Sequence, residues 1–75
     1  MAFIEDLADE LARDVLSAQP ELGDDRFYEE VGKVLLAASP TLHEAYMTSI
    51  RIRLAEARGR VFLEQKLAQL RASKS

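Results

Sequence analysis

The second half of the chain contains a strong signal for the start of a helix and then almost nothing that could end one. In the stretch SPTLHE, Ser39 can cap a helix with Pro40 at its first position, or Thr41 can cap it in a Thr-x-x-Glu box with Glu44. No proline follows, and Gly59 is the single glycine after this point. Any fold of this chain must therefore accommodate a long C-terminal helix.

Two shorter helices are expected before this one. Residues 3–18 place apolar side chains at steps of three and four, and Pro20 should end that helix because the residue before a proline avoids the helical region. After a loop, PELGDD, whose glycine suits a turn, Asp24 or Asp25 can cap a second helix over residues 25–38. The positions expected to face the core are Ile4, Leu7, Ala8, Leu11, Val15 and Ala18 in the first helix and Phe27, Val31, Val34, Leu35 and Ala38 in the second.

The lengths of these helices are unequal. At 1.5 Å per residue, a helix over residues 40–71 is about 48 Å long, and each earlier helix could cover only about half of it. Gly32, in the middle of the second helix, suggests a close approach of another helix there. The sequence therefore predicts an all-α, single-domain fold over residues 1–75. An antiparallel helical hairpin packs on a long C-terminal helix, with a possible bend at Gly59 and a frayed tail at residues 72–75.

The segment TSIRIRL, residues 48–54, could instead form a strand, because its isoleucines and arginines alternate. In this respect it resembles the strand that opens ribbon–helix–helix repressors, which would imply a dimer with paired strands in the major groove of DNA. That fold needs two helices after the strand, and about 20 residues remain here. A helix start also precedes the segment by fewer than ten residues with no turn residue between them. We therefore expect a helix.

The predicted third helix has two apolar rows, and a short hairpin can cover only one. Leaving its large side chains in water would forgo roughly 1.5–3 kcal/mol for each of them. We therefore expect self-association, as a homodimer joined through the third helices, and a general role in protein–protein interaction. The alternative is a monomer whose first helix covers the distal half. The candidate interface residues are Ile52, Ala55, Gly59, Phe62, Leu63, Leu67 and Leu70.

Charge is divided unevenly along the chain. Residues 1–38 carry ten acidic against three basic side chains, a net charge of −7, and residues 39–75 carry three against seven, a net charge of +4. We expect the two halves to neutralise each other, since an acidic half would repel a phosphate backbone. The alternative is a small dimeric nucleic-acid-binding regulator that uses the basic segment 48–60. The candidate electrostatic contacts are Arg51, Arg53, Arg58 and Arg60.

No pattern of residues indicates catalysis, a cofactor or a metal, so we do not expect an enzyme. The chain has no cysteine, and its single histidine, His43, has no nucleophile or orienting carboxylate placed by a motif. The acidic loop residues Glu21, Asp24 and Asp25 lack the spacing of a calcium loop and suit a solvated turn. The longest apolar run, VLLAA, is too short to cross a membrane, and no signal peptide is evident, so we expect a cytoplasmic protein.

Overall fold

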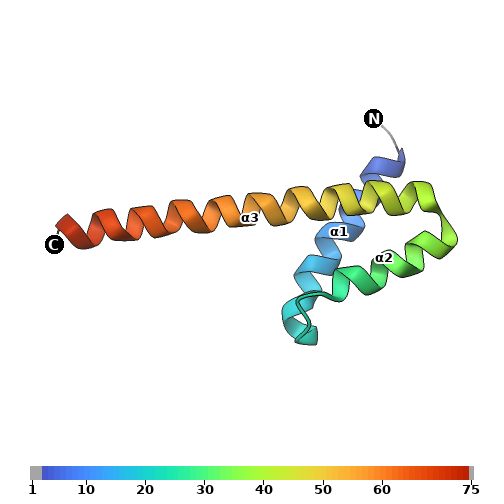
Figure 1. The fold of residues 1–75 in the computed structure, drawn as a ribbon, viewed down its shortest axis with the longest axis horizontal. Coiled ribbons are helices and arrows are strands. Elements are labelled where there is room, and N and C mark those ends of the chain that lie inside the picture. The colour runs from blue at the N-terminus through green and yellow to red at the C-terminus, as the bar shows by residue number, and fades with distance from the viewer. Residues whose placement is uncertain (1–2, 75) are drawn as a thin grey trace.

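The computed structural model of this chain describes residues 3–74, and these residues form three helices (Figure 1). They are α1 (Phe3–Leu22), α2 (Phe27–Ala38) and α3 (Pro40–Lys74). Helices α1 and α2 diverge from the short loop that joins them, and the first part of α3 crosses the open end of this hairpin. The predicted all-α arrangement, with a hairpin packed on a long C-terminal helix, is confirmed.

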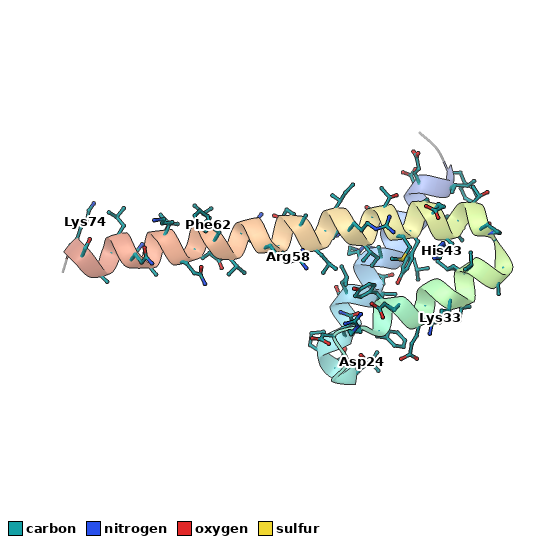
Figure 2. The ribbon with its side chains drawn as sticks, viewed as in Figure 1. Asp24, Lys33, His43, Arg58, Phe62 and Lys74 are labelled. Carbon is teal, nitrogen blue, oxygen red and sulfur yellow. The ribbon has the colours of Figure 1, made fainter. Side chains whose placement is uncertain are left out.

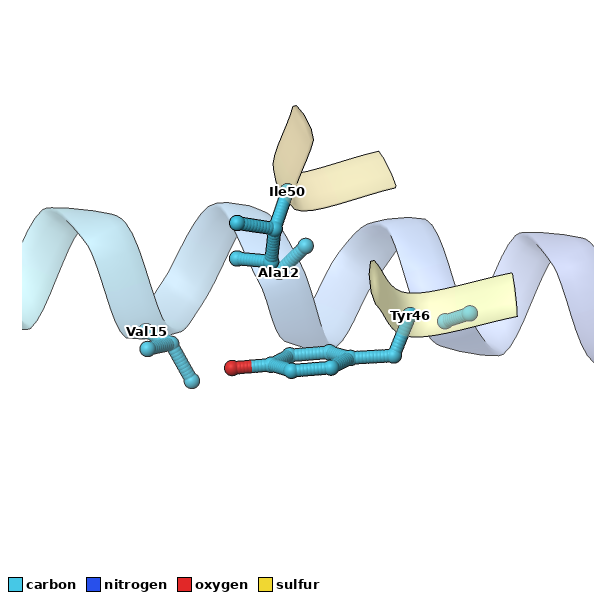
Figure 3. Close-up of a cluster of buried hydrophobic side chains, with 5 residues drawn as sticks. Ala12, Val15, Tyr46 and Ile50 are labelled. Carbon is cyan, nitrogen blue, oxygen red and sulfur yellow. The ribbon is translucent and has the colours of Figure 1, made fainter. Parts of the chain in front are cut away.

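The core lies where α1 crosses α3. Among the described residues, those with buried hydrophobic side chains are Ala8, Ala12, Val15, Tyr46 and Ile50. Figure 3 shows Ile50 above Ala12 and the ring of Tyr46 extending along α1 toward Val15. The small alanines allow the two helices to approach closely, and the large side chains of α3 fill the space beside them. This core is small because it spans only the first part of α3.

The hydroxyl group of Tyr46 has a partner inside the core. It donates a hydrogen bond to the backbone carbonyl of Tyr28 in α2, with 2.9 Å between the oxygens. The bond satisfies a polar group on a side chain that is fully buried. Desolvation by burial raises the pKa of Tyr46 to about 12. Tyr46 thus connects all three helices.

The end of α1 differs from the prediction. The helix continues through Pro20 to Leu22 and ends in a Schellman motif, with Gly23 in the left-handed conformation at φ +66°. The amide of Gly23 donates to the carbonyl of Pro20, and the amide of Asp24 donates to that of Gln19. Pro20 is tolerated because it lies in the last turn, and because buried Gln19 holds that turn in place. The Oε1 of Gln19 accepts a hydrogen bond from the amide of Tyr28 at 2.9 Å.

The starts of α2 and α3 decide between the predicted caps. Neither Asp24 nor Asp25 caps α2, whose N-cap position is Arg26; Asp24 instead accepts the amide of Arg26 within the turn. At α3, the Oγ of Ser39 accepts a hydrogen bond from the amide of Leu42 at 3.2 Å, so the predicted Ser39 cap is correct.

The predicted close approach of another helix at Gly32 is also confirmed. A Cβ built at Gly32 would lie 3.5 Å from the Sδ of Met47 in α3.

Helix α3 is longer and more regular than expected. It continues through Gly59 as one helix, without the possible bend. Of the predicted frayed tail, residues 72–74 belong to the helix, and Ser75 lies outside the described residues. The basic residues Arg71 and Lys74 in its last turn complement the negative end of the helix dipole. No helix within residues 3–74 combines the length and hydrophobicity needed to cross a bilayer.

Candidate interaction surface

The second half of α3 extends away from α1 and α2 (Figure 1). We call residues 55–74 the distal segment. The last core neighbour on α3 is Leu54, which is partly buried. The described chain measures 55 × 31 × 13 Å, and its radius of gyration is 16.0 Å, whereas a compact chain of this length would have about 11 Å. The predicted monomer alternative, with α1 lying along the distal segment, is wrong.

Six of the seven predicted interface residues belong to the distal segment, where Figure 2 labels Phe62, and Ile52 lies just before it on α3. The exposed fraction is 62% for Phe62 and 52% for Leu63, two large side chains that a folded core would normally cover. Ile52 and Leu70 are similarly exposed. Ala55 and Gly59 are also exposed, and Leu67 is half-buried.

These residues do not all share one face of the helix. At 100° per residue, Ile52, Gly59, Leu63 and Leu70 fall within about 40° of one another. Phe62 and Ala55 lie to one side of this line, and Leu67 lies to the other. Their spacing in the sequence suggested that these seven residues form the second of the two apolar rows. In the structure they form a central stripe with flanks, which together make a broad apolar surface.

Salt bridges position two of the four candidate arginines. Arg53 donates from Nε and Nη2 to the two carboxylate oxygens of Asp9 in α1, at 3.0 and 2.9 Å, and Ser49 donates to the same carboxylate. The hydrogen bond from Arg53, aided by that from Ser49, lowers the pKa of Asp9. Arg60 pairs with Glu56 one turn earlier in α3. Arg51 and Arg58 are exposed elsewhere on the helix.

These pairs weaken the case for a nucleic-acid surface. The strand version is wrong, because residues 48–54 lie within α3. In the helical version, Arg53 and Arg60 already hold carboxylates that a phosphate would have to displace. The expected neutralisation between the acidic and basic halves occurs at the Asp9–Arg53 pair, where α1 crosses α3.

A groove runs beside this crossing. Glu5 and Asp9 of α1 form one side, and Ala45, Ser49, Ile52 and Glu56 of α3 contribute to the other. No pattern in the sequence predicts this groove, because its shape depends on the angle between two helices, which no local pattern encodes. The groove opens onto the same face of α3 as Ile52, so it continues the central apolar stripe.

Some apolar residues predicted to be buried are exposed. Ile4 and Leu7 of α1, and Val34 and Ala38 of α2, face solvent instead of the core. They belong to the first turns of α1 and the last turns of α2. These are the ends at which the two helices diverge (Figure 1).

The buried face of α1 is formed by Ala8, Ala12, Val15 and Gln19, so the predicted stripe was rotated from it and missed Ala12 and Gln19. Helical periodicity could not show how α1 is rotated against α3 or how far the hairpin opens.

The single histidine packs between helices. The side chain of His43 is about one-fifth exposed and lies against Gly32, with its Nδ1 3.8 Å from the carboxylate of Glu44. Within residues 3–74, no three acidic, histidine or cysteine side chains gather as metal ligands would.

Comparisons with known proteins identify no relative of this chain: no family model, no curated protein and no solved structure matches it.

Proposed function

We propose that this protein is a small helical protein–protein interaction module that self-associates through the distal segment of α3. The observation that carries the proposal is the exposure of Val61, Phe62, Leu63 and Leu70 on a helix that extends away from the rest of the described chain. Each of these side chains is at least half exposed, so covering one would contribute roughly 1–2 kcal/mol. An apolar surface of this kind marks an interaction site.

The marginal stability of a single helix supports the same conclusion. A helical segment without tertiary contacts lacks the main source of its stability, because most helical stability in proteins comes from tertiary packing. The Glu56–Arg60 pair within the distal segment adds little, since exposed pairs at this spacing contribute about 0.3–0.5 kcal/mol. A helix packed alongside would supply the missing contacts.

A second copy of the chain is the partner that the charges favour. Helix α1 carries six acidic side chains and one basic side chain, whereas the distal segment carries five basic and two acidic ones. The distal segment of one copy can therefore approach α1 of another with favourable electrostatics. An acidic protein partner would satisfy the same charges, but it would leave the exposed α1 acids of this chain without a role.

Sedimentation of matched variants tests the proposal. The wild-type chain should sediment at high micromolar concentration as a species of about twice its 8.4 kDa mass. Leu63→Ser should shift it toward the monomer, whereas Leu36→Ser, at an equally exposed leucine of α2, should not. A wild-type monomer would refute the proposal, as would equal effects of the two substitutions. Salt-sensitive binding of DNA by a monomeric chain would instead favour the nucleic-acid alternative.

A further inference from the structure

Six exposed positions on α3 follow the spacing of a coiled-coil seam. Successive members are separated alternately by four and three residues, which keeps them on one face of a slightly supercoiled helix. This face points away from Tyr46 and Ile50, the side chains that α3 buries against the hairpin. We call these positions the seam: Ile52, Glu56, Gly59, Leu63, Lys66 and Leu70.

When two copies of the seam run in opposite directions, the residues that face each other are complementary. Apolar residues stand at its two ends, the acidic Glu56 and the basic Lys66 stand at equal distances from its centre, and Gly59 mirrors Leu63. We propose that two copies of this chain pair through antiparallel α3 helices, with the two-fold axis beside residue 61. This inference rests on the proposed function and adds to it the orientation and register of the dimer.

The register places three complementary contacts on each side of the axis. Ile52 packs on Leu70 of the second copy, Glu56 faces Lys66, and Leu63 covers Gly59. Gly59 has no heavy atom within 4 Å of the position a Cβ would take, so the space above it is open to a leucine from another helix. The side chain of Leu63 then inserts as a knob into the hole above Gly59 of the second copy, as in a coiled coil.

A parallel pairing of the same seam is unfavourable. It would set Glu56 against Glu56 and Lys66 against Lys66, and would place the two glycines together with no side chain between them. Like charges across a helix interface are destabilising, and a gap forfeits packing. The antiparallel register replaces both repulsions with attractions and fills the gap with Leu63.

The groove beside the α1–α3 crossing accommodates the end of the partner helix. Beyond the Ile52–Leu70 contact, the last turn of the second copy passes Ser49, on the α3 side of the groove. There Lys74 of the second copy approaches the acidic side chains of Glu5 and Asp9 on α1. The groove and the stripe therefore form one continuous contact surface.

The residues that flank the seam are consistent with this register. Phe62 lies beside the axis, where it meets Phe62 of the second copy, and paired aromatic rings stabilise an interface beyond their burial. On the opposite flank, Arg60 approaches its own counterpart. Its charge is offset within each copy by the salt bridge to Glu56.

Disulfide trapping tests the register, because the chain contains no cysteine. Ile52→Cys and Leu70→Cys proteins, one of them labelled with a heavy isotope, are mixed and mildly oxidised. The expected product is a mixed dimer that links position 52 to position 70, while each protein oxidised by itself stays largely uncrosslinked. Arg58→Cys, on another face of α3, is the matched control and should not crosslink.

The outcomes separate the register from the proposed function. A wild-type chain that sediments as a monomer overturns both. A wild-type dimer in which Ile52→Cys and Leu70→Cys each crosslink to themselves overturns the antiparallel register and leaves the proposed function standing. Crosslinking at Arg58→Cys equal to that at the seam would show random collision, and would also overturn the register.

A charge reversal provides a second, independent measurement. Lys66→Glu should raise the dissociation constant of the dimer about tenfold, because it turns two attractions into two repulsions. Arg58→Glu makes the same change of charge off the seam and should leave the constant within about twofold. A double-mutant cycle isolates the contact, because Glu56→Lys alone accounts for the lost salt bridge to Arg60. Glu56→Lys and Lys66→Glu together should cost less affinity than the sum of the two single substitutions. Additive costs, with helix content unchanged by circular dichroism, would contradict the Glu56–Lys66 contact.

Discussion

The buried tyrosine of the core makes the stability of this protein sensitive to alkaline pH. Tyr46 is fully buried at the meeting point of the three helices, and burial raises the pKa of its hydroxyl from 10.0 to about 12. The folded protein therefore favours the neutral phenol more strongly than the unfolded chain does. The stabilisation from this preference is complete below pH 10 and is lost as the pH rises toward 12.

The size of the effect follows from the shift. One pKa unit corresponds to about 1.4 kcal/mol, so the loss in the free energy of unfolding should be about 2–3 kcal/mol between pH 10 and pH 12. Tyr46→Phe should remove this pH dependence. At neutral pH it should also cost about 1 kcal/mol, because the hydrogen bond to the Tyr28 carbonyl is lost.

A tyrosine-free comparison makes the assay specific. The chain has two tyrosines, so Tyr28→Phe leaves Tyr46 as the sole phenol, and the carbonyl of residue 28 that accepts its hydrogen bond is retained. Near-ultraviolet absorbance then follows ionisation of Tyr46, and urea unfolding of Tyr28→Phe with and without Tyr46→Phe gives the difference in stability. Ionisation near pH 10 in the folded protein, with no difference between the two pH profiles, would refute the reasoning.

Two further substitutions test the packing of α3 on the hairpin. Gly32→Ala should raise the free energy of unfolding, measured by urea titration, by about 0.5–1 kcal/mol. The reason is that alanine favours the helix and that its Cβ would make an ordinary van der Waals contact with Met47. A loss of stability would show that α2 has no room for a methyl group there. Asp9→Asn should lower stability at neutral pH, since it breaks the pair with Arg53. Because the pKa of Asp9 is lowered in the folded protein, the stability that the ionised Asp9 contributes is present above about pH 3.8 and is lost as the pH falls through the pKa of the folded state. The melting temperature of Asp9→Asn should therefore change less on acidification than that of wild type.

The local signals in the sequence predicted most of the secondary structure. The Ser39 cap, the glycine in the first loop and the absence of later helix breakers predicted where α3 begins and that it is long. The errors came where a tertiary contact outweighed a local preference. Pro20 did not end α1, because Gln19 is buried and bonded to α2, and Asp24 did not cap α2.

The candidate surface was predictable in its members but not in its geometry. Helical periodicity identified Ile52, Phe62, Leu63 and Leu70 as apolar residues in excess of what a short hairpin could cover, and the structure places them in solvent. The same periodicity assigned Leu7 to the core, where it does not lie. Spacing records which face of a helix is apolar, but the angle between helices decides which part of that face is covered.

The sequence by itself determined that this chain forms three helices and that the last is too long for the other two to cover, because caps, helix propensity and length are properties of neighbouring residues. The tertiary structure decided where the coverage ends. The crossing of α1 over α3 at Ala12 and Ile50, and the pairing of Asp9 with Arg53, fix the hairpin at one end of the long helix. Contacts between residues so distant in the chain depend on the packing angle of whole helices, and this angle leaves the distal segment exposed.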